Sequence, residues 1–288
     1  MNLLILDAGH AKSSKGKRNT LANPDFFEYV FNNDMQYKLK QRAEAHGITV
    51  KLTNPDPANV KDIPLTTRAN KANEFYNNAG KPKCLFISLH ANAAGSCAEW
   101  ANARGVEVYH ASNASQETRT VAERMSKQIY DDVYATDKGF RNRGRKQSNF
   151  TVIYKTRPKA ILIEYGFYDN KQDLNVLNNK RNVLVEATMK QICNYFGIAY
   201  KPPTGGSTAS NVPSGADWKN GSHECRAKAI TELNIRAGRP GSSGYNTILK
   251  TIPAGTIVNC KYCLDGWVST YDFSNIPGFV RTKYLQKI

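Results

Sequence analysis

Three short apolar runs, each followed by a polar side chain at its end, constrain the fold of this chain more than any other feature. The runs cover residues 3–6, 85–89 and 160–163, and the side chains that follow them are His10, His90 and Glu164. Continuous apolar runs of this length are typical of strands that are buried on both faces. Open α/β sheets place their chemistry beyond the carboxyl ends of such strands. We therefore expect the three polar groups at one edge of one sheet.

The residue types at these strand ends favour metal or acid–base chemistry. One histidine after a strand is most often a packed or capping residue, but here two of only five histidines occupy equivalent positions. Imidazole and carboxylate groups bind zinc and also transfer protons. His110 is a further candidate ligand. We interpret it as a residue on the face of a strand, because no small-residue turn follows it.

Alternation of predicted strands and helices indicates an α/β fold. Amphipathic or capped segments predict helices over residues 34–47, 66–78, 115–134 and 183–196, and further strands are expected over residues 48–52, 105–110 and 152–154. Residues 136–148 read as a basic loop, either solvated or forming a rim that holds an anionic or sugar-bearing substrate. The order of elements predicts a mostly parallel, twisted sheet flanked by helices, with right-handed crossovers.

A change of composition divides the chain. Residues 201–216 are rich in proline, glycine and serine and have no apolar period, which is typical of a linker. The following residues carry short strand-like runs separated by turn residues, so residues 217–288 are expected to form a small all-β unit. Residues 1–200 then form the larger domain.

The net charge of +16 predicts a polyanionic partner, among which nucleic acid, anionic lipid and anionic wall polymers are candidates. An uninterrupted basic run and a nucleic-acid-binding motif are both missing, which makes nucleic acid the weaker interpretation. We expect no membrane insertion, because no apolar stretch is long enough to span a bilayer. We also expect no signal peptide, since the first strand occupies its place.

Six cysteines raise the question of disulfides or a second metal site. Without an export signal, reduced thiols are the expectation. Cys260 and Cys263 form a Cys-x-x-Cys pair that His223 and Cys225 would complete as a four-ligand zinc site. We disfavour this site, because the alternation of a short strand does not aim both sulfurs of the pair in one direction.

Four separated motifs resemble those of the zinc-dependent N-acetylmuramoyl-L-alanine amidases of type 3, which occur in sporulation enzymes, autolysins and phage endolysins. They are Leu-Asp-Ala-Gly-His10, Phe-Glu28, Ser-Leu-His90-Ala-Asn92-Ala and Leu-Ile-Glu164-Tyr-Gly-Phe-Tyr-Asp-Asn170, and the resemblance spans residues 1–199. It implies that His10, Glu28 and His90 hold zinc and that Glu164 is the catalytic acid and base. From matches in the same region we assign the candidate substrate-binding residues Asn92, Arg68, Arg143 and Arg145.

The C-terminal part resembles the bacterial SH3-type domains that autolysins and endolysins use to bind cell walls. The matching fragments include Leu-Asn-Ile-Arg236, Gly-Trp267-Val and Gly-Phe-Val-Arg281-Thr-Lys-Tyr284. Trp267, Tyr271 and Tyr284 are candidate wall-binding residues, and both a core role and a role in a peptide-binding groove stay open.

The chemistry of the residues alone predicts a zinc hydrolase that acts on an uncharged carbonyl, with water at the open metal position acidified to a pKa of about 7. The resemblance implies that the substrate is peptidoglycan and the bond is the amide between N-acetylmuramic acid and L-alanine. With a wall-binding tail and no export signal, the layout resembles a phage endolysin held in the host cytoplasm until its release to the wall. A zinc peptidase acting on the stem peptide or cross-bridge, and a non-catalytic wall-binding protein, are the alternatives.

Overall fold

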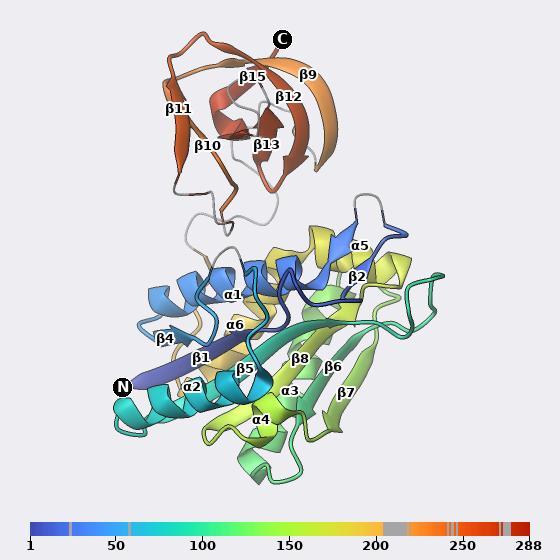
Figure 1. The fold of residues 1–288 in the computed structure, drawn as a ribbon, viewed down its shortest axis with the longest axis vertical. Coiled ribbons are helices and arrows are strands. Elements are labelled where there is room, and N and C mark those ends of the chain that lie inside the picture. The colour runs from blue at the N-terminus through green and yellow to red at the C-terminus, as the bar shows by residue number, and fades with distance from the viewer. Residues whose placement is uncertain are drawn as a thin grey trace. The chain divides into compact units, whose positions relative to one another are not determined.

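The structure is a computed structural model that describes residues 1–22, 25–56, 59–203, 218, 220–240, 242, 245, 247–270, 272 and 278–288. It divides into two compact units, Met1–Pro202 and Pro203–Ile288 (Figure 1). Of the predicted linker, only residues 201–203 lie in the described part of the chain. The predicted domain limits therefore stay a prediction.

The first unit is built on a six-stranded sheet with the order β4-β1-β5-β8-β6-β7. Its strands are β1 (Asn2–Ala8), β4 (Thr49–Leu52), β5 (Lys83–Asn92), β6 (Val106–His110), β7 (Asn142–Gln147) and β8 (Lys159–Phe167). Neighbouring strands are parallel except for β6 and β8, which are antiparallel. The expectation of a mostly parallel sheet is confirmed, and the single antiparallel contact makes the sheet mixed.

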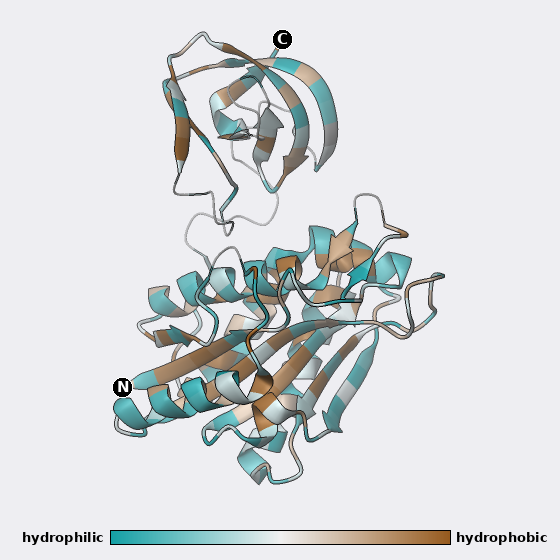
Figure 2. Ribbon diagram, viewed as in Figure 1, coloured by the Kyte–Doolittle hydropathy of each residue, from teal (hydrophilic) through white to brown (hydrophobic). Residues whose placement is uncertain are grey.

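Helices cover both faces of this sheet (Figure 1). One face packs against α1 (Glu28–Ala45), α3 (Gln116–Tyr134), α5 (Lys171–Asn179) and α6 (Arg181–Phe196), and the other against α2 (Leu65–Asn78) and α4 (Thr151–Tyr154). Alternate residues of β1 enter the two cores: Leu4 and Leu6 the first, Leu3 and Ile5 the second. A strand buried on both faces needs a continuous apolar run, and β1 is brown along most of its length in Figure 2.

Three elements differ from the sequence-based prediction. Helix α1 begins at Glu28, six residues before the predicted start at residue 34. Residues 152–154 belong to the single helical turn α4, not to a strand, because periodicity cannot distinguish the two in so short an apolar run. Residues 142–147, predicted as loop, form edge strand β7. Its polar sequence fits an edge position, where one side of the strand meets solvent.

The second unit is all-β, as predicted, with the strand order β11-β10-β14-β13-β12-β9-β15. The strands are β9 (Gly221–Ala229), β10 (Leu233–Arg236), β11 (Ile248–Ile252), β12 (Ile257–Leu264), β13 (Trp267–Thr270), β14 (Gly278–Arg281) and β15 (Leu285–Lys287), with a short 3-10 helix at Thr282–Tyr284. Strand β9 was not predicted, because its sequence is mostly polar. The hydrophobic core of the second unit includes Val258, Val268 and Val280.

The small hairpin of β2 (Arg18–Asn19) and β3 (Phe26–Phe27) lies between β1 and α1 in the chain of the first unit. It ends at Phe27, the residue directly before α1. Among the described helices of both units, none combines the length and apolar character needed to cross a bilayer.

Candidate metal centre

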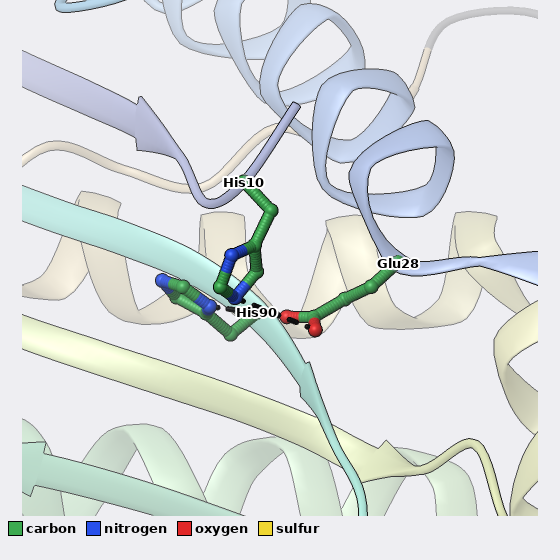
Figure 3. A group of neighbouring side chains, drawn as sticks. All are labelled: His10, Glu28 and His90. Atoms are coloured by element: carbon green, nitrogen blue, oxygen red, sulfur yellow. Dashed lines mark hydrogen bonds and ion pairs between the residues drawn. The ribbon is translucent and has the colours of Figure 1, made fainter. Parts of the chain in front are cut away.

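Two histidines and one glutamate from separate elements converge in the first unit. His10 follows β1, His90 lies in β5 and Glu28 is the first residue of α1. One ligand atom from each residue lies within 4.8 Å of the others, and Figure 3 shows the three side chains pointing toward one another. Nε2 of His10 is 3.5 Å from one carboxylate oxygen of Glu28, and Nδ1 of His90 is 3.1 Å from the other. The structure thus brings together the three predicted zinc ligands.

Close approach of two parallel strands sets this geometry. The backbone N–H of Gly9 donates to the carbonyl of Leu89 at 3.0 Å. A Cβ atom on Gly9 would overlap the imidazole of His90, so only glycine fits at this position. The next residue, His10, has a φ of +61°, a left-handed conformation that turns its ring back over β5. The small-residue turn after β1 therefore leaves the space in which the His90 ring lies.

Helix α1 supplies the carboxylate and holds it in place. Asn32, one turn after Glu28, donates from its side-chain amide to the carbonyl of Gly9 at 2.9 Å and to Glu28 at 3.3 Å. The backbone N–H of Ala91 also donates to Glu28, at 3.3 Å. One carboxylate is thus fixed against both strands that carry the histidines.

The charge states of the ligands suit a cation. Burial lowers the pKa of His10 to about 4, more than the nearby Glu28 carboxylate raises it, so its imidazole is neutral at neutral pH. Burial alone would raise the pKa of Glu28, but its hydrogen bond to His90 and the charges of the neighbouring histidines outweigh burial and lower it. A metal binds neutral imidazole and ionised carboxylate, and these are the forms that His10 and Glu28 favour here.

Glu164 lies beside this group without belonging to it. It is paired directly with His90 across β5 and β8, and with Glu107 across β8 and β6. Its Oε2 atom is buried and has no hydrogen-bond partner among the described residues. Burial, followed by the charge of Glu28, raises the pKa of Glu164 well above its usual value. A buried carboxyl group with a raised pKa is a candidate for general acid and base catalysis.

A row of charged side chains continues from Glu164 toward the edge of the sheet. Glu107, which is 2% exposed, forms ion pairs with Arg143 and with Lys146, and accepts a hydrogen bond from Tyr109 at 2.6 Å. The guanidinium of Arg143 also lies 5.0 Å from the ring centroid of Phe167. Sequence reasoning missed Glu107. A glutamate between two valines of an expected buried strand was the signal that could have identified it.

Two of the predicted substrate-binding arginines lie elsewhere. Arg68 is 3% exposed and its guanidinium pairs with buried Asp7 at 3.0 Å, so it lies beneath the site and not at its rim. Arg145 pairs with Glu123 of α3 at 2.9 Å, on the face of the sheet opposite to Glu107. Both substrate-binding assignments stay predictions.

The other two residues assigned to substrate binding, Arg143 and Asn92, lie on strands that carry residues of the site or of the charged row beside it. Arg143 lies on the same face as Glu107, and Asn92 is the half-buried last residue of β5, two residues beyond His90. His110 is 2% exposed and its Nε2 faces the guanidinium of Arg145 at 3.2 Å. It is a residue on a strand face, as interpreted from the sequence, and not a ligand.

The disfavoured zinc site in the second unit does not form a cluster. In the part of the chain that the structure describes, His10, Glu28 and His90 are the only group of three or more potential ligands that converge. Cys260 and Cys263 are both buried in the core of the second unit, and Cys225 pairs with Cys260 across β9 and β12. These cysteines are therefore core residues.

A groove of about 410 Å³ lies on the second unit. Trp267 and Tyr284 line it, as do Tyr245, Arg236 and Arg281. The third candidate wall-binding residue, Tyr271, lies outside the described residues.

Comparison with known proteins adds relatives of one family. Residues 4–194 match the family described as N-acetylmuramoyl-L-alanine amidase. The probable cell wall amidase LytH of Staphylococcus epidermidis is 28% identical over 195 residues, which are 67% of this chain and 58% of the relative. The LytH protein of Staphylococcus aureus is 27% identical over 197 residues and is covered to the same 58%. This chain thus spans less than two thirds of the length of these curated relatives.

Solved structures share the fold of the first unit. The catalytic domain of CwlV, an N-acetylmuramoyl-L-alanine amidase from Bacillus (Paenibacillus) polymyxa var. colistinus, has a TM-score of 0.55 and 25% identity, over 69% of this chain and 100% of that domain. An N-acetylmuramoyl-L-alanine amidase from Clostridium difficile 630 has a TM-score of 0.57 at 23% identity, over 68% of this chain and 97% of its own. Since the family match covers more than half of the chain and includes all of the converging residues, this protein belongs to the N-acetylmuramoyl-L-alanine amidase family.

Proposed function

We propose that this protein hydrolyses peptidoglycan at the amide between N-acetylmuramic acid and L-alanine, with a zinc ion held by His10, Glu28 and His90. The observation that carries the proposal is the convergence of two imidazoles and a carboxylate beside the buried Glu164, in a chain of this family. The amidases named above support the choice of bond.

The donor set fits zinc. Two imidazole nitrogens and one carboxylate oxygen are a common protein ligand set of catalytic zinc sites, in which the fourth position stays open. The buried Oε2 of Glu164, which lacks a partner among the described residues, fits a site that receives a further polar group. When bound, zinc would polarise the scissile carbonyl and lower the pKa of water.

Glu164 is the residue placed to move protons. It accepts a proton from the attacking water and delivers it to the amide nitrogen, which must be protonated to leave as an amine. Burial raises the pKa of Glu164 well above its usual value, which makes it a better proton acceptor than an ordinary carboxylate when it takes the proton of the water. Arg143 and Lys146, held by Glu107, supply positive charge on the same face for binding acidic groups of the substrate.

Product analysis tests this function. Purified wall is digested with the protein, with and without a chelator, and the fragments are identified by mass spectrometry. We expect new N-terminal alanine and free muramic acid lactyl groups, and no products after chelation. Any other new amine would instead show a peptidase of the stem or cross-bridge, and the absence of products in both samples would leave a wall-binding protein.

We propose further that the second unit is an SH3-type domain that binds the wall, and that the whole protein acts as a phage endolysin. The aromatic and cationic groove of the second unit supports wall binding, together with the sequence resemblance. The endolysin role rests on the resemblance alone. It is tested by producing the protein inside a bacterium with and without a pore-forming protein; lysis that does not need the pore would contradict the proposed release.

A further inference from the structure

A chain of hydrogen bonds connects His90 to buried residues beneath the site. Asp7 in β1 and Ser88 in β5 are directly paired across the two strands, and the Ser88 hydroxyl donates to Asp7 at 2.7 Å. Oγ of Ser88 also lies 3.2 Å from Nε2 of His90, two residues further along the same face. The opposite ring nitrogen of His90, Nδ1, faces Glu28. One ring nitrogen of His90 thus contacts the buried hydrogen-bond network, and the other faces the proposed metal ligand Glu28.

The number of protons fixes the direction of these bonds. A serine hydroxyl has one hydrogen to donate, and here the hydroxyl of Ser88 donates it in a hydrogen bond to the Asp7 carboxylate. Oγ of Ser88 can then only accept from His90, so Nε2 of His90 must carry a hydrogen. In a neutral imidazole this leaves a lone pair on Nδ1, the atom that faces Glu28 and the metal position. The chain of bonds therefore selects the tautomer that a metal needs at Nδ1.

Buried charges hold Asp7 in its acceptor role. Arg68 donates to Asp7 at 3.0 Å, and the hydroxyl of Thr53 donates to the second carboxylate oxygen. Asp7, Ser88 and Thr53 are fully buried and Arg68 is 3% exposed. Burying the ion pair of Arg68 and Asp7 costs about as much desolvation energy as the attraction between the two charges returns. A contribution to the stability of the fold is therefore a weak explanation for this network. Its other end is a proposed metal ligand, which points to a role at that ligand.

We propose that Asp7 and Ser88 are positioning residues for the metal site: they orient the His90 ring, hold its proton on Nε2 and leave Nδ1 free to bind the ion. The inference rests on the proposed role of His90 as a ligand. Hydrogen bonds to the outer nitrogen of a metal-bound histidine fix its orientation and raise its affinity for the ion. Arg68, first assigned to substrate binding, acts here by holding the Asp7 carboxylate in place through its ion pair.

The test is the Ser88→Ala variant, in which only the hydroxyl is lost. Zinc affinity is measured by competition with a chromophoric chelator, and the cobalt-loaded protein is examined by visible absorption. We expect zinc affinity to fall by about 10- to 100-fold, as for other outer contacts of metal-bound histidines, and the cobalt bands to shift. An affinity within twofold of wild type would overturn the inference.

A second variant controls for the loss of a buried hydroxyl. Ser126→Ala removes a fully buried serine hydroxyl from helix α3, outside the network of Asp7 and Ser88. It should keep the wild-type zinc affinity. A loss equal to that of Ser88→Ala would mean that general destabilisation explains the effect.

Nitrogen NMR of the zinc-loaded wild-type protein gives a measurement that needs no variant. We expect the His90 ring to carry hydrogen on Nε2 and to bind the ion through Nδ1, and the reverse pattern would overturn the inference. Failure of the proposed function has a different signature. Wild-type protein that binds zinc but releases no alanine from wall would refute the amidase activity and leave the positioning role standing.

Discussion

An ideal Cβ atom on Gly9 would lie 2.0 Å from Cε1 of His90. A contact so short cannot exist, so either the imidazole or the turn after β1 would have to move. His10 is the residue after Gly9. The positions of the His10 and His90 side chains therefore both depend on the close approach of β1 and β5. The distance between the two imidazoles is thus set by the absence of a single side chain.

We expect Gly9→Ala to weaken zinc binding by at least about tenfold, since displaced ligand geometry is as harmful as a lost outer contact. The measurement is zinc content after dialysis against graded chelator. Gly95→Ala is the matched control, because a Cβ atom there meets nothing within 4 Å and the φ of Gly95 is not left-handed. Equal zinc retention in the two variants would refute the steric argument.

The sequence predicted the parts of the site that are encoded locally. His90 and Glu164 follow an apolar run directly, and His10 follows one after Asp7, Ala8 and Gly9, so the position of each strand places the side chain. Glu28 was found only by resemblance, because the start of α1 carries no side-chain cap and its N-cap residue is Phe27. A helix without a capping residue gives no local signal of where it begins.

Parts of the site that depend on strand register could not be predicted. The pairing of β6 with β7 shifts between Val106 and Val108, and this irregularity decides which face each side chain of β7 occupies. Arg143 and Arg145 therefore lie on opposite faces, although alternation in a regular strand would place them together. Likewise, the burial of Arg68 depends on its pairing with Asp7, a residue far away in the sequence.

Loss of the proton-transferring carboxyl should separate metal binding from catalysis. We expect Glu164→Gln to keep zinc and to lose about 10²- to 10⁴-fold in kcat, the usual contribution of general acid and base catalysis. Glu28→Ala should lose the metal as well as the activity. Wall turbidity and zinc content are measured on the same samples. Undiminished clearance by Glu164→Gln would remove its proposed role.

The same variant should change how stability depends on pH. The folded-state pKa of Glu164 is raised above its usual value of 4.5, so its contribution to stability is fully present below about pH 4.5 and is lost as the pH rises toward that folded-state pKa. Glu164→Gln has no such loss. Relative to wild type, its free energy of unfolding in chelator should increase with pH, by up to about 1.4 kcal/mol per pH unit. Urea denaturation from about pH 4 to pH 7 measures this, and a pH-independent difference would contradict it.

The two arginines of β7 should behave differently. Arg143, paired with Glu107 on the face of the site, is expected to contribute to substrate binding, so Arg143→Gln should lower kcat/KM by about tenfold, the value of one charge-assisted hydrogen bond. Arg145→Gln removes the same charge from the opposite face and should leave kcat/KM nearly unchanged. Initial rates on soluble wall fragments compare them. Equal losses would show that total charge matters, and not its position.

The groove on the second unit has positive charge available for a ligand. The guanidinium of Arg236 lies 4.9 Å from the ring centroid of Tyr245, and that of Arg281 lies 6.0 Å from the ring of Trp267. Neither arginine has an acidic partner within ion-pair distance among the described residues. Stacked guanidinium groups are held flat with their donors directed outward, which suits the binding of carboxylates or phosphates.

Replacing both arginines should therefore weaken wall binding while the first unit keeps its activity. In a pelleting assay with purified walls, the Arg236→Gln and Arg281→Gln double variant should lose most of its salt-sensitive binding, but cleave soluble fragments at the wild-type rate. The matched control replaces Arg226 and Lys228, two exposed cations on β9 outside the groove, and has the same net charge. If both double variants pellet alike, wall attraction comes from the charge of the whole protein. If only the groove variant stays in solution, the walls are bound at Trp267 and its neighbours, because general attraction would treat the two pairs equally.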